Sequence, residues 1–542
     1  MALLAVSGIA LLALILYALL FTGRRDRRLP PGPPTLPIIG NLHQIPPKGS
    51  YLKFTEWATK YGGIYSLKLG PGTAIVLTDR ALVKALIDKK SSIYSNRPHS
   101  YVSHNLITGG DHILIAHYGK VWQLYRKYIS QHFSKKMVEE DHVPIQQAEM
   151  SQMLHDFMVR PEDHMIHPKR YSNSIAMSTI WGVRTPNINT PHMKRLYDMM
   201  ERWSVVMEAG NTPPVDFFPL LHYIPQSWIG DNWRSRASRV GDEMNSLYGE
   251  LLDQLYTRRK EKGGMLTFMD RVLDDQEKTG NLELNRHQLY FMGGTMMEGA
   301  SDTSAAILLA GIQGLTRWPE TQKKAQEEID RVVGPDRLPT WEDFDRLPYV
   351  SAVVKEAMRW RPVTPLAFPH AVDEDDWIDG HFIPKGSVIF INVWGLHHSP
   401  SFLPPNITHP TVFNPDHYYP GQGKPPLPLA NDLAISTDPN NRDHYGYGSG
   451  RRMCPGIHLA ERNLWLGFAG LLSAFEFSGS GKGSEIDTDP QRAYSEGFLV
   501  CAKQYGLNVQ VRGRTPEERE KRRQTIVAAQ QTAQDDVFSR YS

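Results

Sequence analysis

Apolar residues recur along most of the chain at the three- to four-residue spacing of amphipathic helices. Near the start, apolar and polar residues instead alternate over 64–69 and 74–77 with Gly70-Pro71-Gly72 between them, which predicts a β-hairpin. The helical spacing predicts helices at 118–136, 144–158, 190–209, 236–260, 286–316, 319–333, 349–360 and 457–474. Short strand-like pieces follow near 372–378, 381–384, 388–392 and 498–510. The pattern predicts a mainly α body with small β-sheets.

The amino-terminal segment is apolar and carries no charge from Ala2 to Phe21. A helix of that length covers roughly 30 Å, enough to cross a bilayer. A cleaved signal peptide is the alternative. The length of the run, the lack of a preceding basic region and the arginines that follow favour a retained anchor with its basic flank in the cytosol. We predict a transmembrane anchor at 2–22 and a basic, proline-rich hinge at 23–34.

Composition narrows the class of protein. Of 542 residues, 41% are hydrophobic and 22% charged, which excludes general disorder. Lys and Arg number 60 against 58 Asp and Glu, so charge gives no reason to expect a nucleic-acid partner. The two cysteines, Cys454 and Cys501, exclude a disulfide framework and a multi-cysteine zinc site. We expect one catalytic domain at 35–511 and a charged helical tail at 512–542.

The densest chemical signal is the segment 445–456, which reads Tyr-Gly-Tyr-Gly-Ser-Gly-Arg-Arg-Met-Cys-Pro-Gly. Its glycines permit close approach of the backbone to a flat ligand. A helix is expected to begin at Pro455, which would place Cys454 at a helix N-terminus beside Arg451 and Arg452 and favour its thiolate. A thiolate is either a nucleophile or a metal ligand. The alternative of a buried structural cysteine suits Cys501 better.

The spacing Tyr447-x-x-Gly450-x-Arg452-x-Cys454-x-Gly456 resembles the haem-ligand signature of the cytochrome P-450 superfamily, with Tyr where Phe is usual. The resemblance implies that Cys454 is the axial ligand of a haem b iron, where a thiolate favours cleavage of the O–O bond. It also implies that Arg452 contacts a haem propionate and that Tyr447 and Gly456 lie against the cofactor. The fold it implies is the cytochrome P-450 fold, with a long central helix over the haem.

Two further segments occur in the order that this family requires. In the predicted helix 286–316, Thr303 is placed to bond the carbonyl of Gly299 one turn earlier, which loosens a helix. The segment is similar to the family's oxygen-binding helix, so Asp302 and Thr303 would be the acid and alcohol that deliver protons. Glu356 and Arg359, at i and i+3, resemble the family's structural ion pair, although a solvated surface pair is the default interpretation of that spacing.

Two more cofactor contacts follow from the resemblance. Trp122 and Arg126 share one helix face at i and i+4 and match the family's Trp–Arg spacing. His370 stands where the family has a His or Arg that binds a propionate. A loop histidine satisfied by ordinary hydrogen bonds is the alternative. The matches run from the predicted anchor to Gly497 and cover about nine-tenths of the chain.

The resemblance implies a haem-thiolate monooxygenase of the microsomal, membrane-anchored type. It would sit in the endoplasmic reticulum membrane with a cytosolic catalytic domain. Its electrons would come from NADPH through an FAD- and FMN-containing cytochrome P-450 reductase, with a cytochrome b-type protein as a second donor. An apolar small-molecule substrate would contact Phe291, Met296, Leu366, Phe368 and Phe498. The pattern Asn392-x-Trp394-x-x-His397 resembles filamentous-fungal members, which favours an aromatic or polyketide-type metabolite as substrate.

Three alternatives stay open from the sequence. A relative that isomerises or dehydrates without a reductase would not need Asp302 and Thr303. A non-catalytic haem-binding protein would form no product with dioxygen and NADPH. If Cys454 were a hydrolase nucleophile, the purified protein would contain no haem.

Overall fold

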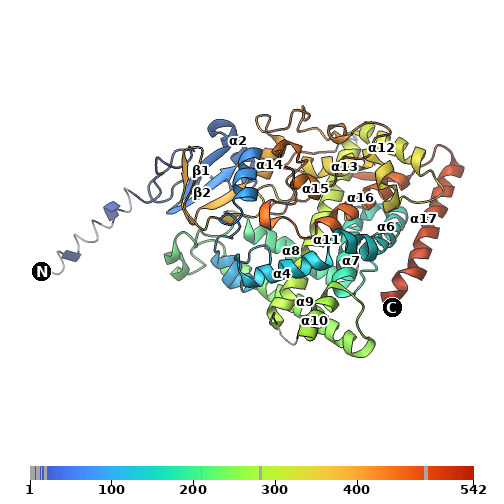
Figure 1. Ribbon diagram of the computed structural model, residues 1–542, viewed down its shortest axis with the longest axis horizontal. Coiled ribbons are helices and arrows are strands. Elements are labelled where there is room, and N and C mark those ends of the chain that lie inside the picture. The colour runs from blue at the N-terminus through green and yellow to red at the C-terminus, as the bar shows by residue number, and fades with distance from the viewer. Residues whose placement is uncertain are drawn as a thin grey trace.

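The computed structural model describes residues 6–7, 13, 15–17, 21–208, 210–279, 283–480 and 486–541. The described chain forms a mainly helical body, with β1, β2 and α2 at the end nearer the N-terminus and α17 along the opposite edge (Figure 1). Most of the predicted anchor at 2–22 lies outside the described residues. In the part that is described, no helix combines the length and the apolar character needed to cross a membrane.

The helices that build the body are α2 (Ser50–Tyr61), α3 (Arg80–Val83), α4 (Lys120–His132), α5 (Lys135–Met137), α6 (Val143–Val159), α7 (His167–Trp181), α8 (Pro191–Met207), α9 (Trp233–Lys262), α10 (Phe268–Thr279), α11 (Arg286–Arg317), α12 (Pro319–Val332), α13 (Pro348–Trp360), α14 (Val393–His398), α15 (Ala430–Ala434), α16 (Ile457–Ala474) and α17 (Pro516–Asp536). Short turns of other helix types include η3 (Tyr101–Thr108), η8 (Pro415–Tyr418) and η10 (Gly450–Arg452). The predicted helices are confirmed with shifts of a few residues at their ends. The helices α2, α7 and α10 were not predicted.

The strands form three small sheets. The strands are β1 (Ile64–Leu69), β2 (Gly72–Leu77), β3 (His370–Ala371), β4 (Asp376–Ile378), β5 (His381–Ile383), β6 (Val388–Ile391), β7 (Phe475–Gly479) and β8 (Leu507–Val511). The largest sheet has the order β1-β2-β6-β3, in which β2 and β6 run parallel and the other pairs antiparallel. The predicted hairpin is confirmed as β1–β2. Pairing of His370 with Ile389 fixes the position of that histidine.

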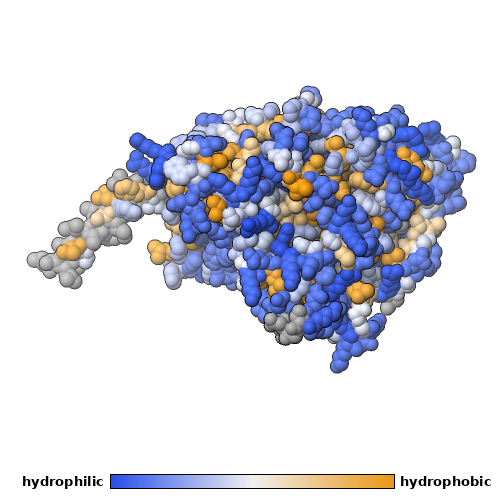
Figure 2. Space-filling model, viewed as in Figure 1, coloured by the Kyte–Doolittle hydropathy of each residue, from blue (hydrophilic) through white to orange (hydrophobic). Residues whose placement is uncertain are grey.

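The central helix is α11, which is buried along most of its length among α7, α9, α13 and α16. Its contact with α16 is close, because a Cβ added to Gly311 would lie 2.2 Å from the ring of Phe468. Helix α7 is buried on every side, including its serines and asparagine. Hydrophilic residues dominate the face drawn in Figure 2, where apolar residues are scattered. The core therefore lies around α11.

The charged tail predicted at 512–542 forms the helix α17, which has a side-chain N-cap. The Thr515 hydroxyl accepts a hydrogen bond from the backbone N–H of Glu518. The helix packs on α6, and Ile526 and Ala533 are its buried apolar residues. A largely polar helix thus docks through a few inward-facing residues.

Candidate active site

A cavity separates the middle of α11 from the loop that carries Cys454. Gly299, Ala300 and Thr303 line it from α11, and Cys454 and Gly456 line it from the loop. A Cβ added to Gly299 or Gly456 would meet no other atom within 4 Å. Small residues therefore leave a slot between the helix and the cysteine.

The backbone of the loop is fixed by a glycine and by two hydrogen bonds. Gly450 has a φ of +61°, and a Cβ there would lie 2.3 Å from the carbonyl oxygen of Ile87. Its N–H donates to Asp88 at 2.8 Å, and the N–H of Cys454 donates to the carbonyl of Tyr447 at 2.8 Å. Helix α16 begins at Ile457 rather than at Pro455, so Cys454 precedes the first helical turn.

The expectation that the protein around Cys454 favours its thiolate is wrong. Burial raises the pKa of the Cys454 thiol, and the N–H of Gly456 and the charge of Arg126 offset this effect only in part. Arg451 and Arg452 direct their guanidinium groups to oxygen atoms elsewhere and do not neutralise the sulfur. A buried sulfur of this kind becomes a thiolate when a metal ion binds it, because the ion supplies the missing positive charge.

Three basic side chains, Arg97, His370 and Arg452, line one end of the cavity, and we call them the cavity cations. Arg97 donates to the carbonyls of Phe368 and Pro369, each at 2.7 Å, and Arg452 donates to the carbonyl of Ser95 at 2.7 Å. None of the three pairs with a carboxylate in the part of the chain that the structure describes.

The electrostatics of the cavity cations show the cost of this arrangement. Burial, with a smaller contribution from the charge of Arg126, lowers the pKa of Arg452 to about 9. The pKa values of Arg97 and His370 are also well below their ordinary values, first because of burial and then because of neighbouring arginines. A buried charge is costly without an opposite partner, so this end of the cavity is suited to an anionic group.

The sequence did not single out Arg97. A lone arginine in a loop cannot be distinguished from a surface residue without knowing that it is buried. Of the other predicted cofactor contacts, Trp122 lies 4.2 Å from the guanidinium of Arg452, and Arg126 donates to the carbonyl of Met453 at 2.7 Å. Trp122 and Arg126 thus lie beside the cysteine loop rather than on the cavity wall.

The structure separates the predicted acid and alcohol. The hydroxyl of Thr303 lines the cavity and donates to the carbonyl of Gly299 at 2.5 Å, the bond that the sequence predicts. Asp302 lies outside the cavity lining. Burial raises the pKa of Asp302, which the charge of Lys169 lowers in part. The alcohol therefore faces the slot, while the acid lies behind it.

A second acid, missed by the sequence reasoning, does face the cavity. Glu298 precedes Gly299 on α11 and lines the cavity, and its Oε2 lies 2.9 Å from Nε2 of His112. Both side chains are fully buried. Glu298 could have been noticed in the sequence, because it is a carboxylate on an otherwise apolar part of the predicted helix 286–316. The histidine, 186 positions earlier in the chain, could not be matched to it without the fold.

The predicted substrate contacts fall into two groups. Met296, Phe368 and Phe498 line the cavity. Phe291 lies behind the wall, in edge contact with Tyr248 at 5.5 Å between ring centres. The structure places Leu366 in a separate apolar cluster beside β1 and β2.

Glu356 and Arg359 form a fully buried ion pair on α13, with 2.7 Å between Arg359 Nη2 and Glu356 Oε1. Arg359 also donates to the carbonyl of Pro410 at 2.8 Å, and Nδ1 of His417 lies 3.4 Å from Glu356. The pair thus ties α13 to the segment that precedes the cysteine loop, instead of lying in solvent as that spacing alone suggests.

These features fit a haem. The slot between Gly299 and Gly456 would accept a flat ring, Cys454 would supply a sulfur ligand for its iron, and the cavity cations would bind its carboxylates.

The amino-acid sequence is similar to known proteins of one family. Residues 30–509 match the family model described as cytochrome P-450. The chain is 50% identical to the cytochrome P-450 monooxygenase macC of Penicillium terrestre, over 99% of this chain and 98% of that protein. It is 49% identical to yanC of Aspergillus niger, over 99% and 98%, and 50% identical to patH of Penicillium expansum, over 98% and 97%, both named cytochrome P-450 monooxygenases. The chain therefore belongs to the cytochrome P-450 family, whose cofactor is haem, and is an oxidoreductase of the monooxygenase class.

Proposed function

We propose that this protein hydroxylates an apolar aromatic or polyketide-type metabolite. The observation that carries the proposal is the cavity itself, which is lined by aromatic side chains as well as by Cys454. Rings of Phe368 and Phe498 meet at 5.3 Å, and Phe498 meets Trp203 at 5.2 Å. A wall of edge-to-face aromatic rings favours a flat apolar substrate. Fungal relatives with matching lengths support a role in secondary metabolism.

Each side chain has a distinct part in this proposal. Cys454 would ligate the haem iron, and Arg97, His370 and Arg452, which line the same cavity, would bind its propionates. The haem, when bound, supplies the oxygen-activating chemistry. Thr303 holds a hydroxyl at the slot, and we assign it the last step of proton delivery. Burial raises the pKa of Asp302, and a proton that it passes to Thr303 must travel through a side-chain movement or a water molecule.

Electrons would come from NADPH through the flavin-containing reductase, with a cytochrome b-type protein as a second donor. Arg126 lies beside the cysteine loop and the exposed Lys127 follows it, which supports docking of an acidic partner on that side. Attachment to the endoplasmic reticulum membrane rests on the apolar segment 2–22 and the arginines after it.

The test is a matched pair of cysteine variants in the full chain. Cys454→Ser should abolish the red-shifted absorption band of the reduced carbon monoxide complex, whereas Cys501→Ser should keep it. Cys501 is the suitable control because it is the chain's other cysteine and lies outside the cavity lining. A band that survives Cys454→Ser would overturn the ligand assignment. With an added reductase, NADPH-dependent product that forms with the wild type but not with Cys454→Ser would support the monooxygenase reaction.

A further inference from the structure

The Glu298–His112 pair has one oxygen atom that the protein does not use. Oε2 of Glu298 lies 2.9 Å from His112, while Oε1 is buried and has no hydrogen-bond partner among the described residues. The backbone N–H of Leu114 donates to Nδ1 of His112 at 3.4 Å, which leaves Nε2 as the ring nitrogen that donates to Glu298. The pair is therefore held in place with one acidic oxygen left over in the cavity wall.

An unsatisfied buried oxygen costs about 1–3 kcal/mol, which a ligand can recover by bonding to it. From this geometry we infer that Glu298 is the anchor for a hydroxyl group on the substrate, and that the substrate is a phenol. The inference rests on the proposed function, because it assumes that the substrate occupies this cavity.

A hydroxyl is the group that fits Glu298 best. It donates to an ionised carboxylate and accepts from a protonated one, so it suits the site in either state. A carboxylate substrate would be repelled by an ionised Glu298, and an ether has no proton to donate. Aromatic side chains next to Glu298 would contact the ring of the phenol. The ring centre of His112 lies 4.6 Å from that of Trp203, and Trp203 in turn contacts Phe498. The acidic oxygen and the aromatic wall are thus adjacent.

The experiment measures binding spectrally in the haem-loaded full chain. The probes are alkylphenols with methyl to propyl substituents, the methyl ethers of the same rings, and the corresponding benzylamines. The wild type should bind the best phenol at least about 100-fold more tightly than its ether, since a buried polar group left unpaired discriminates strongly. In Glu298→Gln, which retains an acceptor for His112, that ratio should fall at least about 10-fold. Glu250→Gln, an exposed glutamate paired with Arg195, is the matched control and should keep the ratio.

Each outcome decides the inference. Equal binding of phenol and ether, or tighter binding of the benzylamine, would overturn it. A ratio that is unchanged in Glu298→Gln, together with less product per NADPH, would show that Glu298 serves proton transfer instead. Failure of the proposed function is a separate result, because it would appear as a wild type that forms no NADPH-dependent product with an added reductase.

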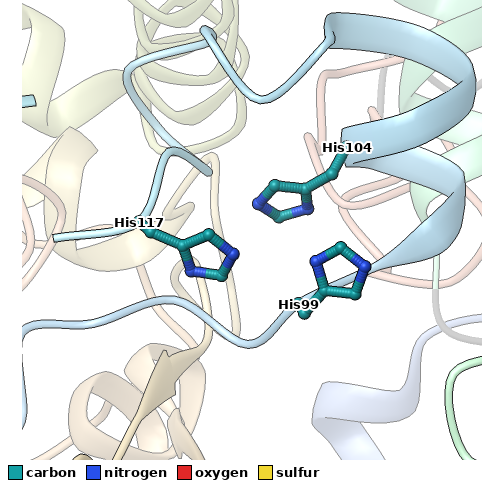
Figure 3. Close-up of side chains that lie close together, drawn as sticks. All are labelled: His99, His104 and His117. Atoms are coloured by element: carbon teal, nitrogen blue, oxygen red, sulfur yellow. The ribbon is translucent and has the colours of Figure 1, made fainter. Parts of the chain in front are cut away.

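A second inference rests on a different cluster. His99, His104 and His117 each offer a ring nitrogen, and these three atoms lie within 4.8 Å of one another. The rings face one another around a common point in Figure 3, with centres 4.8, 5.0 and 5.9 Å apart. Zn–N bonds of about 2.0–2.1 Å place the centres of coordinating imidazoles roughly 5 Å apart. The arrangement therefore needs only small side-chain movements to close on a metal ion.

The surroundings of the cluster resemble the outer shell of a metal site. Nε2 of His104 lies 3.1 Å from the carbonyl of Ile115, and Nδ1 of His117 lies 3.4 Å from the amide oxygen of Asn96. Such acceptors orient metal-binding histidines. We propose that the three histidines bind one Zn²⁺ and thereby tie the two ends of the segment 99–117, which includes His112, to each other.

Zn²⁺ itself is the probe. Competition with a fluorescent chelator on the metal-stripped, haem-loaded protein should give one tight site per chain. His99→Ala and His117→Ala should each weaken it by about 100-fold, and the exposed His409→Ala should leave it unchanged. Zn²⁺ should also raise the Tm of the wild type but not that of His117→Ala. The proposal would be overturned if the wild type bound Zn²⁺ no more tightly than His99→Ala and His117→Ala do.

Discussion

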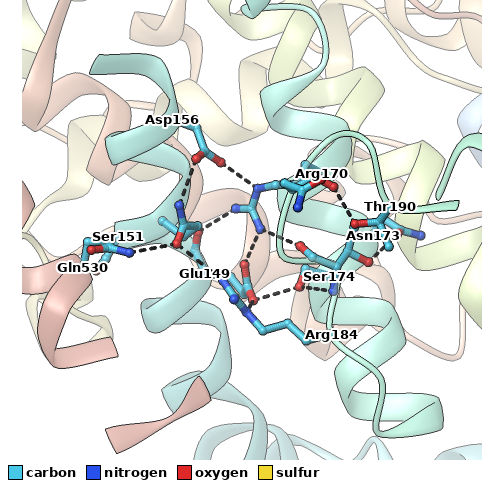
Figure 4. A network of polar contacts seen from close by, with 12 residues as sticks. Glu149, Ser151, Asp156, Arg170, Asn173, Ser174, Arg184, Thr190 and Gln530 are labelled. Atoms are coloured by element: carbon cyan, nitrogen blue, oxygen red, sulfur yellow. Dashed lines mark hydrogen bonds and ion pairs between the residues drawn. The ribbon is translucent and has the colours of Figure 1, made fainter. Parts of the chain in front are cut away.

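The α6–α7 interface and the cavity both bury cations, but only the interface supplies carboxylates to neutralise them. Arg170 and Arg184 meet Glu149 at 2.5 and 2.8 Å, and Arg170 lies 2.8 Å from Asp156 (Figure 4). We call these four residues the α6–α7 network. Burial alone would lower the pKa of Arg170, yet Glu149 and Asp156 raise it above its ordinary value. The network is complete without any ligand.

The cavity cations have the opposite balance. Arg97, His370 and Arg452 are satisfied by carbonyl oxygens, and their pKa values fall because no carboxylate offsets burial. The difference teaches that burial of charge does not by itself mark a functional site. A functional site is marked by buried cations that lack a carboxylate partner beside an open cavity. The free-energy cost of burying such cations is recovered only when an anionic group binds there.

The largest effect should come from breaking the complete network. Glu149→Gln leaves Arg170 and Arg184 buried with one carboxylate fewer, which should lower the free energy of unfolding by about 3–5 kcal/mol. Denaturant unfolding followed by tryptophan fluorescence measures this. Glu140→Gln, on an exposed pair with Lys136, should change it by less than about 1 kcal/mol. Equal stabilities of the two variants would contradict the structural role of the network.

A buried carboxylate, Glu328, tests through pH whether a buried charge without an ionic partner lowers stability. Glu328 accepts hydrogen bonds from the N–H groups of Tyr349 and Val350, and burial nevertheless raises its pKa to about 7. Because the folded-state pKa exceeds the ordinary 4.5, its stabilising contribution is complete below pH 4.5 and is lost as the pH rises through 7. Relative to Glu328→Gln, the wild type should lose about 2–3 kcal/mol between pH 4.5 and 8. Parallel stability curves for the two proteins would show that the carboxylate is solvated.

Substitutions of the cavity cations should affect stability and haem binding differently from substitutions in the α6–α7 network. Arg97→Met should leave the unfolding free energy of the haem-free protein unchanged or higher, since it removes a buried charge. It should also weaken haem binding by about 10- to 100-fold, the value of one or two hydrogen bonds to a charged group. Haem transfer to an acceptor protein measures the loss. Arg184→Met in the network is the matched control, with lower stability and unchanged haem retention. The comparison fails if the two variants behave alike.

Local pattern predicted much of this fold and part of this site. Helices with one apolar face, such as α4, were found from their spacing, whereas α7 is buried on all sides and shows no such period. The bond from Thr303 to Gly299 is local and was predicted. The separation of Asp302 from the cavity was not, because the sequence does not show which side of a buried helix faces an open space.

Contacts between distant segments were the least predictable. His112 meets Glu298 only because the segment before α4 packs on α11, and Arg97 lies near enough to Arg452, 355 positions later, for the two charges to interact. The pKa of Cys454 was predicted with the wrong sign for the same reason. Its neighbours in sequence are cationic, but the atoms that surround it in space are mainly apolar.

The smallest expected effect concerns the hydroxyl of Tyr447, near the sulfur of Cys454. The hydroxyl of Tyr447 is buried and has no hydrogen-bond partner in the described chain, while the Tyr447 carbonyl holds the N–H of Cys454 through the backbone. Tyr447→Phe removes the unpaired hydroxyl and keeps that backbone bond, so it should raise the free energy of unfolding by up to about 1 kcal/mol. The haem reduction potential should stay at its wild-type value, because the hydroxyl does not bond to the sulfur. A shifted potential would mean that the phenol donates to the ligated sulfur once haem is bound. Tyr447 would then belong with the cavity cations, as a group whose partner comes with the cofactor.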